Sequence, residues 1–218
     1  MPRAADPPTS PDLPDELARA ALNRLTAGDE HVEIELEGAS LAEQRAAGVS
    51  LEAARLRQVD LSSSRLERLS LLDCELRGCN LSNLQAGGGA LRRVVLDNCR
   101  LTGMALPDAA LQDVTVRGCR VDLASFALAR LERVTFEDCM LVQADFLEGR
   151  LVSVRFHGCD LTRADFRGVR LQRCELRGSD LTGVQGIDSL RGIAMPWSDI
   201  VDLAGVWAAA LGIEVLED

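Results

Sequence analysis

The sequence predicts an all-β solenoid with four sides, and three observations support this fold class. Every fifth residue from Leu36 to Leu181 is apolar, and the residue two places before it is usually small. A second period of twenty is superimposed, because residues 131–146 align with residues 151–166 without a gap. Aromatic residues make up only 3% of the chain and Tyr is absent, which indicates a narrow interior filled by Leu and small side chains.

The period of five predicts how the chain is wound. An α-helix repeats every 3.6 residues and a strand every two, so neither gives this pattern. A chain that turns a corner after every five residues does, because each side then sends equivalent side chains inward, and four sides close one coil. The apolar positions make about 7.5 coils, and a spacing of about 4.8 Å gives a rod roughly 36 Å long. Stacked coils then share one continuous core.

Several pentads share one motif, in which a small residue and Asp or Asn precede Leu or Phe. The clearest examples are Cys79-Asn80-Leu81, Ala144-Asp145-Phe146, Cys159-Asp160-Leu161, Ala164-Asp165-Phe166 and Ser179-Asp180-Leu181. This pattern resembles the pentapeptide-repeat family over about residues 34–184. The resemblance implies a right-handed quadrilateral parallel β-helix of about 7–8 coils. The flanking segments add the expectation of short capping α-helices at both ends.

Two segments precede the repeats. Residues 1–12 are rich in Pro and lack the apolar centre of a signal peptide, so we expect a disordered tail. Residues 13–30 are expected to form a capping helix over the open end of the solenoid, because apolar side chains recur at helical spacing and Gly28 offers a stop. These side chains are Leu17, Ala18, Ala21, Leu22 and Leu25.

The β-helix is expected over residues 31–186, with two weak places. Gln44 occupies an inward small position, and residues 87–89 are three consecutive glycines. The glycines invite a phosphate-loop interpretation, but the Lys and the following helix of such a loop are missing. A thin or distorted coil is the preferred interpretation. The five-residue frame continues across both places, so we expect no inserted loop.

Residues 187–218 are expected to cap the other end of the rod. Apolar residues recur at helical spacing from Asp199 to Leu211, with Ser198 as the expected N-cap and Gly212 as the stop. The end of a solenoid exposes unpaired strand groups that need to be covered, which is the first role of this helix.

A homodimer is also expected through this C-terminal segment. The helix leaves apolar residues on the sides that do not face the rod, and relatives in the pentapeptide-repeat family often dimerise through their C-terminal ends. The resemblance therefore implies an interface that includes Trp197, Val206, Trp207 and Ala210.

The cysteines and histidines favour neither a metal site nor catalysis. All seven cysteines lie at inward small positions, and five of them, from Cys79 to Cys159, recur every twenty residues as one column. Neighbours in this column would lie within disulfide distance, but buried reduced thiols are preferred for a chain expected in the cytoplasm. With only two histidines and no Cys-x-x-Cys pair, we expect no metal and no cofactor. No catalytic set of side chains recurs, so we expect no enzyme activity.

The charges suggest where a protein partner binds. The net charge of −10 arises from the two ends of the chain, whereas residues 36–181 are neutral. The side centred on Leu51, Leu71 and their equivalents up to Leu171 carries a net charge of +3, and outward apolar residues gather near it. We expect this surface to bind an acidic protein. Its candidate residues are Arg130, Arg133, Arg150, Arg170, Arg173, Leu128, Leu147 and Val152.

The family resemblance supplies an alternative function. Some pentapeptide-repeat proteins resemble DNA in shape and charge and bind DNA gyrase, which protects it from quinolones. A DNA duplex 36 Å long would carry about 21 negative charges, whereas the acidic side centred on Leu41 and Leu61 has a net charge of only −2. A non-enzymatic scaffold or protein-binding rod in the cytoplasm is therefore the leading prediction, and a DNA-mimicking gyrase-binding protein is the alternative. We expect neither direct nucleic-acid binding nor a membrane span.

Overall fold

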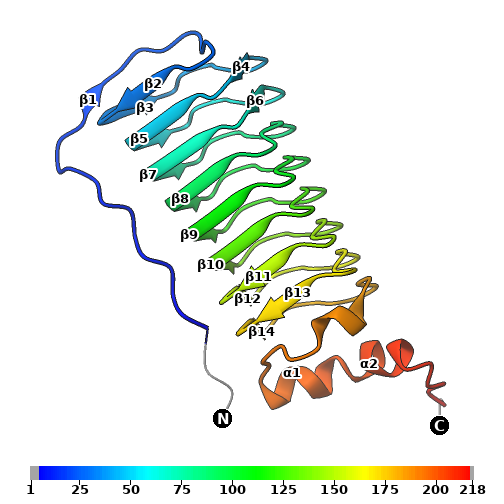
Figure 1. Ribbon diagram of the computed structural model, residues 1–218. Coiled ribbons are helices and arrows are strands. Elements are labelled where there is room, and N and C mark those ends of the chain that lie inside the picture. Colours follow the sequence, from blue (N-terminus) through cyan, green and yellow to red (C-terminus); the bar gives the residue numbers. More distant parts are fainter. Residues whose placement is uncertain (1–4, 217–218) are drawn as a thin grey trace.

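A computed structural model describes residues 5–216 and shows a right-handed parallel β-helix of about eight turns, as predicted (Figure 1). Within the main sheet the strands stack along the rod in the order β1-β3-β5-β7-β8-β9-β10-β11-β13, and β2, β12 and β14 pair off this path. Successive coils keep the twenty-residue register that the sequence predicts, so that Leu71 pairs with Leu91 and Leu91 with Leu111. The double period of the sequence is therefore the period of the fold.

The strands differ in length along the rod. They are β1 (Ala18–Arg19), β2 (Glu30–Val32), β3 (Ile34–Glu37), β4 (Arg45–Ala47), β5 (Ser50–Arg57), β6 (Arg65–Glu67), β7 (Ser70–Arg77), β8 (Ala90–Asp97), β9 (Ala110–Arg117), β10 (Arg130–Glu137), β11 (Arg150–Val152), β12 (Arg155–His157), β13 (Arg170–Gln172) and β14 (Glu175–Arg177).

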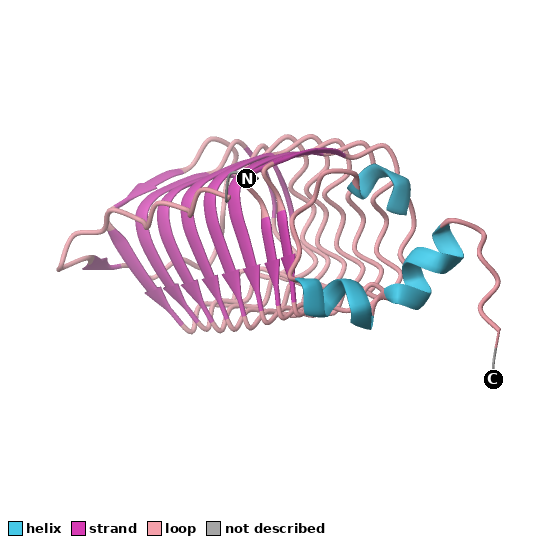
Figure 2. Cartoon of the chain, turned by 90° about the horizontal axis from the view of Figure 1, so that it is seen from below, coloured by secondary structure: helices cyan, strands magenta, loops and turns pink. Residues whose placement is uncertain are grey.

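The four sides of the rod are of two kinds. Two adjacent sides are covered by the eight-residue strands β5, β7, β8, β9 and β10. We name them face A (residues 50–52 and their equivalents every twenty residues) and face B (residues 55–57 and their equivalents). The other two sides are mostly turns, joined from coil to coil by single bridges such as Ser125↔Asp145. Figure 2 shows the strands gathered on one part of the rod and the turns on the other.

Each corner of the coil has the same backbone conformation. Every fifth residue from 33 to 183 has a positive φ, including side chains as large as Leu128, at 61°, and Arg133, at 51°. This left-handed conformation costs a non-glycine residue roughly 1–2 kcal/mol. The stacking of coils on both sides holds the chain in it, so the turn is enforced by tertiary structure rather than by residue type.

The interior matches the predicted pattern. All the apolar positions from 36 to 181 are buried except Leu171, which is half-buried in the last coil. In the C-terminal half the core holds two Phe columns on opposite sides. Phe126, Phe146 and Phe166 stack with ring centroids 5.2 and 5.0 Å apart, and Phe136 stacks on Phe156 at 5.2 Å. Edge-to-face contacts join the two columns, in the geometry that aromatic pairs prefer.

The cysteines are all free and buried, as predicted. Each thiol points at the backbone of the preceding coil; the Sγ of Cys119, for example, lies 3.5 Å from the carbonyl oxygen of Leu96. Burial raises the pKa of the Cys74 thiol to about 12 and also raises that of Cys174. These thiols are packing groups with a local hydrogen bond.

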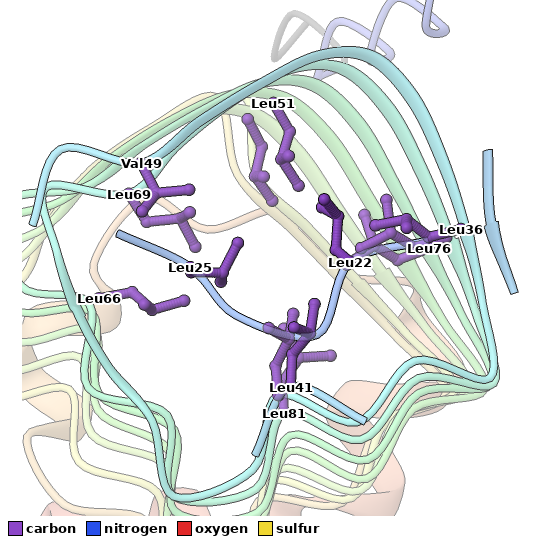
Figure 3. Close-up of a pocket in the computed structure, with 13 residues that line it drawn as sticks. Leu22, Leu25, Leu36, Leu41, Val49, Leu51, Leu66, Leu69, Leu76 and Leu81 are labelled. Carbon is purple, nitrogen blue, oxygen red and sulfur yellow. The ribbon is translucent and has the colours of Figure 1, made fainter. Parts of the chain in front are cut away.

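The prediction of a capping helix over residues 13–30 is wrong. This segment contains the short strand β1, which pairs in parallel with β3, and no helix. The open end of the first coil offers unpaired backbone groups, and an added strand satisfies them where a helix would not. The segment still covers this end: Leu25 is buried and Leu22 packs against the core (Figure 3). Beneath them remains an apolar cavity of about 20 Å³.

The prediction of a disordered tail over residues 1–12 is also wrong for the part that the structure describes. Residues 5–12 run extended along the outside of the rod, from the β1 end towards the last coils (Figure 1). Hydrogen bonds and an ion pair fix them there. Residues 1–4 lie outside the described residues.

The C-terminal segment contains helices, although they differ in detail from the prediction. A 3-10 helix, η1 (Ile187–Leu190), is followed by α1 (Trp197–Asp202) and α2 (Ala204–Ala210). Two short helices replace the single helix expected, and Pro196 rather than Ser198 precedes the first one. Pro suits this boundary because it fixes φ and needs no N–H partner. Gly212 follows α2 with a positive φ, as a stop residue should.

Side chains from this segment complete the last coil. In the body of the rod, the N–H of Gly158 donates to a backbone carbonyl of the next coil, at Arg177. In the last coil, side chains take the place of that carbonyl. The Oδ2 of Asp199 accepts from the N–H of Gly178 at 2.5 Å, and the Oγ of Ser189 accepts from the N–H of Gly168 at 3.1 Å. The segment is thus a cap in the hydrogen-bonding sense.

The two weak places in the repeat leave the register intact. The coil that contains residues 87–89 leads directly into β8, without an insertion. At the other weak place, the Oε1 of Gln44 accepts from the N–H of Leu25 at 3.1 Å and so ties the N-terminal segment to the first coils. No helix within residues 5–216 is long and apolar enough to cross a membrane.

Candidate protein-interaction surface

Three predicted partner-binding residues form a row on face A. Arg130, Arg150 and Arg170 pair in register at the start of β10, β11 and β13, and all three side chains are exposed. Residues paired in this way lie about 4.8 Å apart, where like charges repel. Within residues 5–216 none of the three forms an ion pair. We name Arg130, Arg150 and Arg170 the arginine row; its positive charge is not neutralised by a neighbour.

Apolar side chains border the arginine row. Leu128, at the corner that precedes face A, is 49% exposed. Leu147 and Val152 are half-buried, the former at the same corner one coil on and the latter within β11. Two further exposed apolar residues, Leu123 and Met140, lie on the turn sides. The row and its border combine charge with apolar area, which is the composition of a protein-binding surface.

The other two predicted arginines lie elsewhere. Arg133 and Arg173 occupy the corner between faces A and B, on the far side of face A from Leu128. Arg133 forms a two-bond ion pair with Asp113 (Nε–Oδ1 2.7 Å, Nη2–Oδ2 2.9 Å), and Arg173 lies 3.2 Å from the carboxylate of Asp6 in the tail. The structure therefore divides the predicted site into an open row and an occupied corner.

This corner carries a second row, which we name the corner row. It consists of one residue from each successive coil: Asp73, Arg93, Asp113, Arg133, Ser153 and Arg173. Arg93 pairs with Asp73 as Arg133 does with Asp113, so the row is built from two Asp–Arg pairs. The sequence carries a signal for this row, since its residues recur every twenty positions and the first four alternate in charge.

Hydrogen bonds set the ionisation of the corner row. The Arg93 guanidinium lowers the pKa of Asp73 against the opposing effect of burial, and the N–H of Asp12 adds to the lowering. Burial would raise the pKa of Asp113, but hydrogen bonds from Arg133 and from the N–H of Thr9 outweigh it and lower the pKa. Both carboxyl groups are therefore charged at neutral pH and present acceptors to the tail.

Ion pairs between coils also neutralise acidic residues on other parts of the rod. Examples within the described residues are Arg55–Glu75, Arg57–Glu35 and Arg117–Asp97. A carboxylate beside a guanidinium contributes little net negative potential. The rod therefore lacks the continuous negative charge that a duplex presents.

Family models match most of the repeat region. The model for the pentapeptide repeat region matches residues 70–146, 89–166 and 118–185, and the model for pentapeptide repeats in eight copies matches residues 47–83. The first model alone covers more than half of the chain. The chain belongs to the pentapeptide-repeat family.

Solved structures similar to this pentapeptide-repeat chain include two of named function. One is a trypsin-treated form of QnrB1, a plasmid-mediated fluoroquinolone resistance protein: the identity is 18%, the TM-score is 0.47, and the match covers 88% of this chain and 100% of that one. The other is HetL from the cyanobacterium Nostoc sp. strain PCC 7120, which is involved in heterocyst differentiation regulation: 24% identity, TM-score 0.39, 80% and 92% coverage. No curated protein sequence matched the chain.

The residues predicted for dimerisation divide into two groups in this pentapeptide-repeat protein. Val206 and Trp207 pack against the core of their own chain, whereas Trp197 is 76% exposed and Ala210 is exposed. Other exposed apolar residues at this end are Ile200, Val201, Leu211, Ile213, Val215 and Leu216. Trp197 and Ala210 are therefore the predicted residues that a second chain can reach.

Groups suited to metal binding are absent from the described part of this pentapeptide-repeat chain: residues 5–216 contain no cluster of three or more His, Cys, Asp or Glu side chains that could hold an ion. The two histidines lie beside single acidic residues, His31 near Asp29 and His157 near Glu175.

Proposed function

We propose that this pentapeptide-repeat protein is a non-enzymatic scaffold that binds an acidic partner protein through the arginine row and its apolar border. The observation that carries the proposal is the set of three exposed guanidinium groups in strand register, without an ion pair within the described chain, beside exposed Leu128. Neighbouring positive charges on a rigid sheet repel each other, and carboxylates of a partner relieve that repulsion.

The fold supports a binding role because the surface is preorganised. Strand pairing fixes the spacing of the row, so little backbone order has to be gained on binding. Arg side chains also suit carboxylate partners, since the planar guanidinium forms two parallel hydrogen bonds. The apolar border supplies area that a partner can bury at the centre of the contact.

Affinity capture from the native host with a matched pair of variants tests the proposal. The first variant carries Arg130→Gln, Arg150→Gln and Arg170→Gln; the control carries Arg45→Gln, Arg65→Gln and Arg100→Gln, which removes three exposed arginines from the turn sides. Partners that the unmodified chain and the control retain, and the row variant loses, are the expected result. Equal capture by all three proteins would refute the proposal.

DNA gyrase remains the alternative partner that the family resemblance suggests, with DNA mimicry as the mode of binding. The ion pairs between coils argue against it, because they neutralise the acidic residues that a mimic needs. A gyrase supercoiling assay decides the question. We expect neither inhibition nor protection from a quinolone at micromolar protein, and either effect would favour the alternative.

Cytoplasmic location and dimerisation belong to the same proposal. The buried reduced cysteines fit a reducing compartment. A tail-to-tail homodimer would bury Trp197, Ala210 and the other exposed apolar residues of the C-terminal end. Light scattering at micromolar concentration is expected to give twice the chain mass, and Trp197→Ser with Ala210→Glu is expected to reduce it to one. A monomeric mass for the unmodified protein would exclude the dimer.

A further inference from the structure

The tail and the corner row meet through a regular set of polar contacts. The backbone N–H of Asp12 donates to Asp73 at 2.8 Å, and that of Thr9 donates to Asp113 at 3.1 Å. Arg155, on face B beside the row, donates to the carbonyl of Ala5, and Arg173 pairs with Asp6 at 3.2 Å. The tail thus runs antiparallel to the order of the coils, with its N-terminal end at the last ones.

The spacing of these contacts matches an extended Pro-rich chain. Thr9 and Asp12 are three residues apart, while their acceptors Asp73 and Asp113 are two coils apart. Three residues of polyproline II span about 9.3 Å, and two coils span about 9.6 Å. Pro favours this conformation and has no N–H, so the donors of residues 7–12 come only from the positions between prolines. Asp113 and Asp73 of the corner row therefore accept hydrogen bonds from two backbone N–H groups that lie one polyproline II turn apart.

The tail leaves part of the corner unsatisfied. Ser153 is only 1% exposed, and its Oγ has no hydrogen-bond partner among the described residues. The Nε atoms of Arg155 and Arg173 are also buried and have no partner there. These three donors lie where the tail supplies one carbonyl and one carboxylate. Buried donors without a partner are costly, so a segment with more acceptor oxygens at this end would fit the corner better than the tail does.

The attachment of the tail is also shallow. Among residues 5–12 only Ala5 is buried, and the others are half-buried or exposed. The contacts are hydrogen bonds and one partly exposed ion pair, each of which contributes modestly in competition with water. A segment held in this way opens more easily than the coils beneath it.

From these observations we infer that the corner row is a recognition site for an extended, Pro-rich, acidic segment of a partner protein, and that residues 5–12 occupy this site as an intramolecular competitor. The partner segment runs antiparallel to the coils, offers an N–H every third residue to Asp113 and Asp73, and places its carboxylates at Ser153, Arg155 and Arg173. This inference deepens the proposed function, since it adds a second site and names the chemistry of its ligand.

Peptide binding to the full-length chain tests the inference. The receptor is the full chain with residues 5–12 replaced by a Gly-Ser segment of equal length. The probe is a fluorescent peptide with the sequence of residues 5–12, Ala-Asp-Pro-Pro-Thr-Ser-Pro-Asp. Fluorescence polarisation is expected to show saturable binding. Binding to the unmodified chain should be weaker by a factor of about ten or more, because a tethered tail competes at an effective concentration of about 1 mM.

Matched variants show whether the corner row is the site. In the tail-replaced receptor, Asp113→Asn with Arg133→Gln is expected to weaken binding about tenfold, which corresponds to the loss of one charge-assisted hydrogen bond. A probe with Asn in place of Asp6 should also bind more weakly. The control is Asp165→Asn with Arg167→Gln, which removes an ion pair elsewhere on the rod and should change nothing. Thermal unfolding followed by circular dichroism checks that each variant is folded.

Three results would overturn the inference. The first is no saturable binding at 1 mM peptide, a concentration on the order of the tethered tail's own effective concentration. The second is equal binding by the corner variant and its control. The third is equal binding by the unmodified and tail-replaced chains. None of them depends on the arginine row. The capture experiment can therefore succeed while this inference fails, and the reverse is also possible.

Discussion

At the scale of the residue, the inward small position selects for more than size. The Sγ of Cys119 lies 3.5 Å from the carbonyl of Leu96, and the hydroxyl groups of Ser64 and Ser179 donate to the equivalent carbonyls of their own preceding coils at 3.1 and 3.2 Å. Cys and Ser are thus alternatives for one role, a compact donor that points along the rod. Ala and Val fill the position without that donor.

Substitution of Cys119 tests this role. Cys119→Ser keeps a donor and is expected to change the free energy of unfolding by no more than about 1 kcal/mol. Cys119→Ala should be tolerated at a similar cost. Cys119→Arg buries an unpaired charge and should prevent folding. Urea unfolding monitored by circular dichroism measures all three, and a folded arginine variant would contradict the packing role.

Thiol reactivity gives an independent check. Burial raises the pKa of Cys74 to about 12, so its thiolate is scarce at pH 8. All seven thiols are buried, which denies a reagent access to them. We expect alkylation of the native protein to be slow at all seven cysteines and rapid in urea. Fast modification without denaturant, measured by mass spectrometry, would show that the column opens.

At the scale of the element, the Phe columns fill the core of the C-terminal half of the rod with rings in contact. Phe146 stacks between Phe126 and Phe166 and meets Phe136 and Phe156 edge to face. The equivalent positions in earlier coils are Leu66, Ala86 and Leu106. The N-terminal coils, lined by Leu, retain the small apolar cavity.

Phe146 is therefore expected to be a sensitive core position. Phe146→Ala should destabilise the protein by about 3–5 kcal/mol. Phe146→Leu reproduces the residue at the equivalent positions Leu66 and Leu106 and should cost less than about 1.5 kcal/mol. Urea unfolding of both variants measures the two losses. A Leu variant as unstable as the Ala variant would contradict this expectation and would show that the ring contacts, rather than apolar volume, stabilise the core.

The docked tail is an element whose stability depends on pH. Arg93 lowers the pKa of Asp73, and Arg133 lowers that of Asp113 against burial, whether or not the tail is docked. The N–H groups of Asp12 and Thr9 lower both values further in the docked state, and both lie below the ordinary value of 3.8. Docking is therefore fully present above that value and is lost as the pH falls through the lowered values. The NMR shifts of the Thr9 and Asp12 amide protons should stay constant from pH 7 to about 5 and change below 3.8. A transition between pH 5 and 7 would contradict this assignment.

At the scale of the whole molecule, the sequence period determines most of the fold because each coil repeats the same local rule. The inward positions, the coil length and the side on which Arg130, Arg150 and Arg170 lie all follow from residue number alone. The N-terminal segment does not obey the rule. The spacing of Leu22 and Leu25 suits a helix, but the free edge of β3 decides the outcome, and that edge exists only after folding.

The tail could not be predicted for a related reason. Its Pro-rich composition is that of disordered segments, and its partners Asp73 and Asp113 are 61 and 104 residues away from the donors. Residue numbering alone places Arg133 and Arg173 beside the arginine row, because they border the same side. The bend at each corner, with its positive φ, separates them from the row.

A repeat architecture also predicts which deletions are tolerated. Removal of residues 131–150, one full coil, joins Arg130 to Leu151 and keeps every later side chain on its own side. Removal of residues 131–152 shifts the frame by two and places Gly158 and Arg163 at core positions. The first variant should fold and be shorter by about 4.8 Å in solution scattering, whereas the second should not fold. Folding of both would contradict the frame.

The docked tail gives the rod a mechanical property that coils alone would not have. An extended Pro-rich chain has little slack, so its contacts hold only while the coil spacing along that corner stays near its resting value. Bending that spreads the coils on this edge separates Asp73 from Asp113 and breaks contacts with the tail, whereas bending towards this edge compresses it. The length of the tail therefore matches one spacing of the rod, that between the coils of Asp73 and Asp113, and its contacts hold as long as that spacing is kept.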